Sequence, residues 1–146
     1  MKSVLLMCNA NPSISPRPNR MIQALQDHYK VTVLSYGKRF DESVQFVPLP
    51  NTNPTHLIGK LALALRCRLA QFEKNIWHKS LVDLKMNLSR SQFDVIICQN
   101  INLLPLALAL RNKGKLLFDA REYYPRHFED KFIWRLFFQK LNLAKQ

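Results

Sequence analysis

FDVIICQNINLLPLALALRNKGKLLFDA, residues 93–120, places a strand, a helix and a second strand in close succession. The apolar run 93–100 is typical of a strand buried on both faces, and residues 115–120 repeat that pattern. Between them, residues 103–112 have the apolar content of a helix, and Gly114 is expected to stop it. A strand–helix–strand unit predicts two parallel strands of one sheet.

The N-terminal half of the chain follows the same scheme. SVLLMC (3–8) and VTVLSY (31–36) predict buried strands, with a helix over residues 17–28 between them. VQFVPLP (44–50) predicts a strand at the edge of the sheet, because its prolines cannot donate hydrogen bonds to a neighbour.

The longest helical pattern covers residues 55–90 and predicts one bent helix or two stacked helices. A last helix with a rich apolar face is expected over residues 131–144. The predicted element order is β-α-β-β-α-β-α-β-α. This order indicates an α/β fold with a Rossmann-like, doubly wound parallel sheet in a single domain that spans residues 1–146.

Charge and composition narrow the classes of function. The 146 residues include 22 Lys and Arg against 10 Asp and Glu, a net charge of +12, and 47% are hydrophobic. The apolar content argues against disorder. The positive charge attracts phosphate groups on nucleic acid, anionic lipid or nucleotide sugars, with a merely solvated basic surface as the alternative. The basic face of residues 60–90 is a candidate for docking on an anionic membrane surface.

The cysteines and the apolar segments indicate the compartment. Cys8, Cys67 and Cys98 form no CxxC pair, so buried free thiols and no metal site are expected. The run 4–8 is too short for the core of a signal peptide, and the uncharged stretch 95–110 falls short of the ~20 apolar residues that a spanning helix needs. We expect a cytoplasmic protein that attaches peripherally to the inner face of the membrane.

Missing motifs exclude several enzyme classes. The chain has three glycines, Gly37, Gly59 and Gly114, and none lies in the loop after the first strand. GxGxxG and GxxxxGK[ST] are both absent, which argues against an NAD-binding domain and a P-loop NTPase. The absence of GxSxG likewise argues against the common α/β-hydrolase.

Polar residues gather in three segments that follow predicted parallel strands. The carboxyl ends of such strands lie at one edge of the sheet, where open α/β sheets bind their ligands. The candidates are Asn9, Asn11, Arg17, Gln99, Asn100, Asp119, Arg121, Glu122 and Arg126.

Two blocks of the sequence carry a resemblance to a known family. Residues 93–130 resemble the strand–helix–strand–loop of family-4-type glycosyltransferases of the GT-B fold, which often show "(Y/F)DVIHAHD", a Leu-Pro-Leu helix and "DxHE(Y/F)P". The matching segments are Phe93–Ile96, Leu104–Leu106 and Asp119–Pro125. The opening strand and residues 15–37 are similar to the first βαβ unit of that family.

The resemblance implies sugar transfer from a nucleotide sugar to a glycan or lipid-linked acceptor, without an essential metal or cofactor. In such enzymes the N-terminal domain mainly binds the acceptor, and a C-terminal domain with a Glu-x₇-Glu segment mainly holds the donor. Nothing in this chain resembles that second domain. We therefore expect a truncated or split acceptor-side domain that is inactive alone and needs a donor-binding domain or chain as partner.

The site departs from the family pattern at one position. Arg121 stands where many members have His, and a guanidinium is always protonated, so it cannot act as a base. Asp119 and Glu122 are therefore the catalytic candidates. Asn9, Arg17, Gln99, Asn100, Arg121 and Arg126 are candidates for binding the acceptor or an anion. In the alternative interpretation Asp119 caps a turn and Glu122 pairs with a nearby arginine.

Two other classes of function stay open from the sequence. The net charge and the aromatic residues near FIWRLFFQK (132–140) are compatible with a nucleic-acid-binding module, although no helix-turn-helix, RNP or zinc motif accompanies them. An interaction-only module without catalytic activity is the other alternative, because the last helix presents a large apolar face.

Overall fold

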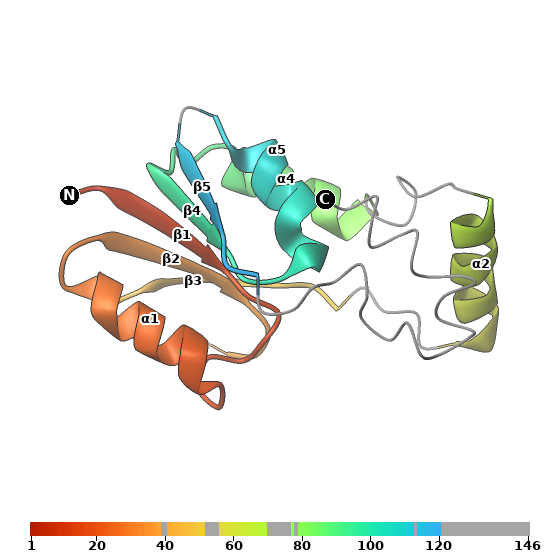
Figure 1. Ribbon diagram of the computed structural model, residues 1–146, viewed down its shortest axis with the longest axis horizontal. Coiled ribbons are helices and arrows are strands. Elements are labelled where there is room, and N and C mark those ends of the chain that lie inside the picture. The colour runs from red at the N-terminus through yellow and green to blue at the C-terminus, as the bar shows by residue number, and fades with distance from the viewer. Residues whose placement is uncertain (39–40, 52–55, 70–76, 78, 113, 121–146) are drawn as a thin grey trace.

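The protein forms a five-stranded, all-parallel sheet with helices on both faces (Figure 1). The computed structural model describes residues 1–38, 41–51, 56–69, 77, 79–112 and 114–120. The strands are β1 Ser3–Met7, β2 Lys30–Ser35, β3 Gln45–Pro48, β4 Val95–Cys98 and β5 Lys115–Phe118. Their order across the sheet is β3-β2-β1-β4-β5. The predicted α/β class with a Rossmann-like parallel sheet is confirmed.

Burial explains why the apolar runs became strands. β1 lies in the centre of the sheet, and its side chains from Val4 to Met7 are at most 2% exposed. Strands that are covered on both faces read as continuous apolar runs, as this one does. β3 lies at the edge, as its prolines predict, and Pro48 is its last residue. β3 runs parallel to β2, although the described residues between Ser35 and Gln45 form no helix.

The alternation of side chains along β1 divides the core into two layers. Val4 and Leu6 face α1, Pro16–Gln26, together with Ile22 from that helix. Leu5 and Met7 face the opposite layer, built by α4, Lys79–Leu88, and α5, Leu104–Leu110. Figure 1 shows α1 on one side of the sheet and α4 with α5 on the other. Each fully buried aliphatic side chain contributes about 1.5–3 kcal/mol.

The helix after β4 is shorter than predicted. A single 3₁₀ turn, Ile101–Leu103, precedes α5, which ends at Leu110 and not at Asn112. Gly114 is therefore not the helix stop that the sequence suggested. A Cβ atom at Gly114 would lie 2.3 Å from the backbone oxygen of Phe93, so glycine is required here for the close approach of two strands.

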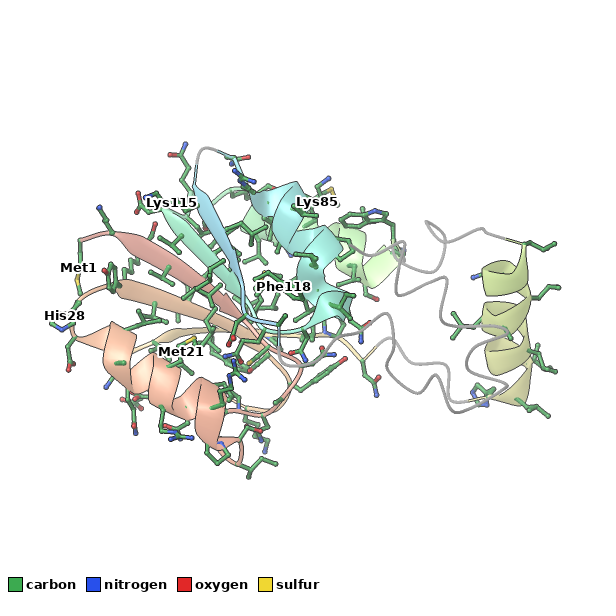
Figure 2. The ribbon with its side chains drawn as sticks, in the orientation of Figure 1. Met1, Met21, His28, Lys85, Lys115 and Phe118 are labelled. Atoms are coloured by element: carbon green, nitrogen blue, oxygen red, sulfur yellow. The ribbon has the colours of Figure 1, made fainter. Side chains whose placement is uncertain are left out.

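The predicted helical region 55–90 contains two separate helices in the described part of the chain. α2 spans Leu57–Arg68, and α4 covers the end of the region. In Figure 1 α2 lies apart from both the sheet and α4, so the two helices are not stacked. α4 packs on the core through Leu81, Leu84 and Leu88, and its Lys85 ammonium lies 5.3 Å from the ring centre of Trp77 (Figure 2).

α2 exposes an apolar stripe along one side. Its large aliphatic side chains are between 58% and 81% exposed, counting the residue that follows the helix: Leu57, Ile58, Leu61, Leu65 and Leu69. None of the helices in the described ranges has the length and apolar character that a membrane span requires. The predicted helix over residues 131–144 lies outside the described residues.

Candidate functional site

The direction in which successive strands are added across the sheet reverses between β1 and β4, although all the strands are parallel. From β1 the chain moves outward to β2 and β3, and it then returns to the other side of β1 to form β4 and β5. Ligands of open α/β sheets bind at such a switch point, outside the carboxyl ends of the strands. We call this edge the carboxyl-end rim and define it by Asn9, Arg17, Gln99, Asn100 and Asp119.

Backbone contacts fasten the two loops at the switch point to each other. The Asn9 backbone N–H donates to Asn100 Oδ1 over 2.8 Å, and the Gln99 backbone N–H donates to the Met7 carbonyl oxygen over 3.0 Å. Asn9 and Asn100 are both partly buried. The side-chain oxygen of Asn100 therefore serves to hold the rim together, which the sequence did not indicate.

Gln99 lies beneath the rim and not on its surface. The residue is 0% exposed, and its Nε2 group lies 3.5 Å from Asp119 Oδ2 and 3.6 Å from Met21 Sδ. Figure 2 shows Met21 on the side of α1 that faces the sheet. These two acceptors fix the orientation of the amide, because only its nitrogen can donate to them. Gln99 Oε1 is buried and has no hydrogen-bond partner among the described residues.

Arg17 and Asp119 form an ion pair across the rim. Arg17 Nη2 donates to Asp119 Oδ1, which joins residues that are 102 positions apart in the sequence. Their side chains are 45% and 20% exposed, so the pair borders solvent. The Asp119 backbone N–H donates to the Cys98 carbonyl oxygen over 2.8 Å and so continues the β4–β5 ladder.

The start of α1 offers little to an anion through its backbone. Ser15 is the N-cap, but its side chain makes no capping hydrogen bond, and Pro16 and Pro18 both lack an N–H. Of the first three helical residues, only Arg17 has an N–H group. Three amides of the preceding loop are already engaged, because Ser13 donates to Asn11 Oδ1 and Ile14 and Ser15 donate to the Asn11 carbonyl.

Two buried cysteines lie next to the rim. Cys8 and Cys98 are buried thiols outside any disulfide, as expected, and the Cys67 side chain lies outside the described part of the chain. Burial raises the pKa of Cys98 to about 11, and its Sγ lies 3.2 Å from the Asn100 carbonyl oxygen. A neutral buried thiol packs as a small apolar group.

Three predicted site residues lie outside the described residues: Arg121, Glu122 and Arg126. The structure brings together Asn9, Arg17, Gln99, Asn100 and Asp119. Sequence reasoning missed the contact of Met21 with Gln99, because a methionine on the apolar face of a helix gives no sign of a polar neighbour.

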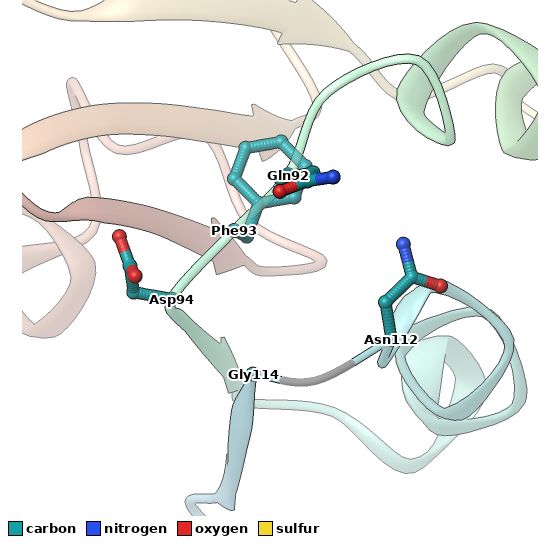
Figure 3. A pocket seen from close by; sticks show the side chains of 5 residues that line it. All are labelled: Gln92, Phe93, Asp94, Asn112 and Gly114. Atoms are coloured by element: carbon teal, nitrogen blue, oxygen red, sulfur yellow. The ribbon is translucent and has the colours of Figure 1, made fainter.

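The opposite edge of the sheet, which we call the amino-end rim, contains a hollow of about 620 Å³ (Figure 3). Its lining residues are Gln92, Phe93, Asp94, Asn112 and Gly114. Asp94 accepts hydrogen bonds from the Ser3 backbone N–H over 2.7 Å and from the Ser3 hydroxyl over 3.0 Å. These bonds lower the pKa of Asp94 and tie β1 to β4. The carboxylate here is used to hold strands together, and the other polar side chains of the hollow are the exposed amides of Gln92 and Asn112. We therefore place the candidate site at the other rim.

The described ranges hold no group of three or more His, Cys, Asp or Glu residues that could bind a metal ion. The chemistry available at the carboxyl-end rim is that of a guanidinium, a carboxylate and a buried amide. Such a set binds anionic and hydroxyl-bearing ligands. No protein-family model matches the chain, and no curated protein matches it either.

Proposed function

We propose that this chain is the acceptor-side, N-terminal domain of a GT-B-type glycosyltransferase. It would act with a donor-binding domain to transfer a sugar from a nucleotide sugar to a glycan or lipid-linked acceptor. The observation that carries the proposal is the convergence of Arg17, Gln99 and Asp119 at the β1–β4 switch point, where α/β sheets bind ligands. The resemblance of residues 93–130 to that family supports it.

Each residue has a role in this proposal. Arg17, Arg121 and Arg126 bind anionic groups, and a fixed positive charge stabilises the diphosphate as it leaves the donor. Asp119 and Glu122 are the carboxylates that act on the acceptor. Asn9, Asn100 and Gln99 shape the floor of the acceptor site. The chain needs no cofactor of its own for this reaction, since the nucleotide sugar is a substrate.

Donor binding by the isolated chain is the direct test of this division of labour. Isothermal titration of the full chain with UDP-glucose and GDP-mannose should give weak or no binding. Co-expression with the C-terminal half of a GT-B enzyme should yield transfer of radiolabelled sugar to a lipid or glycan extract. Tight donor binding by the chain alone would contradict the proposal.

We also propose that the protein attaches peripherally to an anionic membrane at the cytoplasmic face. The support is the apolar stripe of α2, where Leu57 and Ile58 are 72% and 81% exposed. The α2 sequence contains basic but no acidic residues, and each basic residue near an anionic bilayer contributes about 1 kcal/mol. Replacing Ile58, Leu61 and Leu65 together by Ser should abolish co-sedimentation with phosphatidylglycerol vesicles. Unchanged co-sedimentation of that variant would exclude α2 as the attachment site.

A further inference from the structure

The guanidinium of Arg17 is only partly used in the structure. An arginine has five N–H donors. One of them, on Nη2, pairs with Asp119, and the others have no partner among the described residues. The side chain is 45% exposed, so these donors are accessible to a ligand from solvent.

The side chain of Arg17 offers more donors to an anion at this rim than the start of α1 offers through its backbone. Helix starts that hold phosphate use free backbone N–H groups, often in a glycine-rich loop. Here Pro16 and Pro18 remove two of the first three N–H groups of α1, and Asn11 accepts those of the three residues before the helix. A ligand anion at the switch point therefore has Arg17 as its main described donor.

Asp119 occupies the position that such an anion would take. Its carboxylate engages the guanidinium through Oδ1 and covers the Gln99 amide through Oδ2. The same amide carries the one buried oxygen in this cluster without a described partner, Gln99 Oε1. A buried carbonyl oxygen without a donor is unfavourable by about 1–3 kcal/mol, and a hydroxyl group would satisfy it.

We propose that the carboxylate of Asp119 competes with a ligand anion for the guanidinium of Arg17. In the free protein its carboxylate holds the guanidinium, and the phosphate group of a ligand replaces it there. The displaced carboxylate and the Gln99 amide that it no longer contacts are then two hydrogen-bonding groups for hydroxyl groups of the same ligand. The ligand class is accordingly a phosphate ester of a polyhydroxyl compound, either a soluble sugar phosphate or the headgroup of a lipid.

If Asp119 competes with the ligand for Arg17, removal of its charge should tighten phosphate binding. If Asp119 only bound the ligand, the same change should weaken binding. Asp119→Asn keeps the shape of the side chain and removes the like charge, so it should tighten the binding of glucose 1-phosphate to the full chain about tenfold. Asp119→Ala should act in the same direction. Arg17→Gln should abolish binding, and Gln99→Leu should weaken glucose 1-phosphate while leaving inorganic phosphate unchanged. Isothermal titration at constant ionic strength measures all four.

A matched control separates local competition from net charge. Asp83 is exposed on α4, and Asp83→Asn alters the net charge as Asp119→Asn does. Because it lies outside the rim, its effect on phosphate binding should stay below about twofold in physiological salt. Circular dichroism of each variant verifies the fold.

The source of the phosphate is distinguished by a second arm with phosphatidylglycerol vesicles. Tighter binding of glucose 1-phosphate by Asp119→Asn supports the competition and identifies a soluble source of the phosphate. Tighter binding of the vesicles by that variant supports the competition and identifies a lipid-linked source. Equal or weaker binding of that variant in both arms would overturn it. The inference rests on the proposed function only in assigning an anion to Arg17. Failure of sugar transfer in the co-expression assay would remove the proposed function and leave this binding result standing.

Discussion

At the amino-end rim Asp94 accepts two hydrogen bonds from Ser3, whereas at the carboxyl-end rim Gln99 Oε1 and most of the Arg17 donors have no partner within the described part of the chain. The hollow of about 620 Å³ lies at the first rim, beside Asp94 and the exposed amides of Gln92 and Asn112. The second rim combines a buried amide oxygen with an ion pair that borders solvent. A buried polar atom without a described partner is rarer than an exposed one, and for that reason we base the proposed site on it and not on empty volume.

The largest expected effect tests the structural role of the amino-end rim. Gly114→Ala would place a Cβ 2.3 Å from a backbone oxygen that cannot move aside easily. We expect a loss of about 2–4 kcal/mol in the free energy of unfolding, measured by urea denaturation. Gly37→Ala is the control. It forces a left-handed residue, φ 97°, against the flexible end of Asn11 and should lose only about 1–2 kcal/mol. Equal losses in both variants would show that the contact with Phe93 is not decisive.

The second effect concerns the pH dependence of the Ser3–Asp94 contact. Because the folded protein lowers the pKa of Asp94 below its ordinary value of 3.8, the contact stabilises the fold above that pH. The stabilisation is lost as the pH falls through the folded pKa. Wild type should therefore exceed Asp94→Asn in stability at pH 7, and the two should converge in acid. A difference that stayed constant from pH 7 down to about 2 would show that ionised Asp94 is not involved.

The third effect, at the carboxyl-end rim, is a gain in stability and not a loss. Gln99→Leu removes the unpaired oxygen and two long contacts of the amide nitrogen, so the protein should gain about 1 kcal/mol in stability or remain unchanged. Gln92→Leu on the exposed amino-end rim is the control and should stay within about 0.5 kcal/mol of wild type. A Gln99→Leu protein that unfolds well below the wild-type temperature would mean that the oxygen is satisfied in solution. The comparison of the rims would then fail.

The smallest effect is the stability contribution of the Arg17–Asp119 pair. A pair that borders solvent contributes about 0–1 kcal/mol, so a double-mutant cycle of Arg17→Gln and Asp119→Asn should give a coupling energy in that range. The coupling should shrink in 1 M salt, where charges separated by more than about 3 Å are screened. A coupling several times larger would assign the pair to fold stability and weaken its assignment as a ligand site.

Much of the fold follows from the sequence, because burial of apolar runs is decided by composition over several residues. Residues 3–8 and 93–100 could adopt few structures other than central strands, and the prolines of 44–50 placed that strand at the edge. The end of the helix after β4 was wrong by two residues, since helix ends depend on local dihedral angles. Gly114 was assigned to the wrong cause, because its close approach to Phe93 is a contact between distant residues that the sequence does not show.

The sequence predicted which described candidate residues gather at one edge of the sheet, but not the contacts that they make. Strand topology alone brings the ends of β1, β4 and β5 to one edge, so the gathering of Asn9, Gln99 and Asp119 could be foreseen. The burial of Gln99 and the pairing of Arg17 with Asp119 could not. Both depend on side-chain conformations that bring together residues far apart in the sequence.

The two prolines at the start of α1 have a consequence for how ligand preference can change. A phosphate cradle made of backbone amides survives most point substitutions, because every residue except proline supplies the same N–H. In the proposed site Arg17 is the described side chain that binds the anion, so a single codon alters the charge that the switch point presents. Glutamate at position 17 would place a second carboxylate beside Asp119 on an unchanged scaffold.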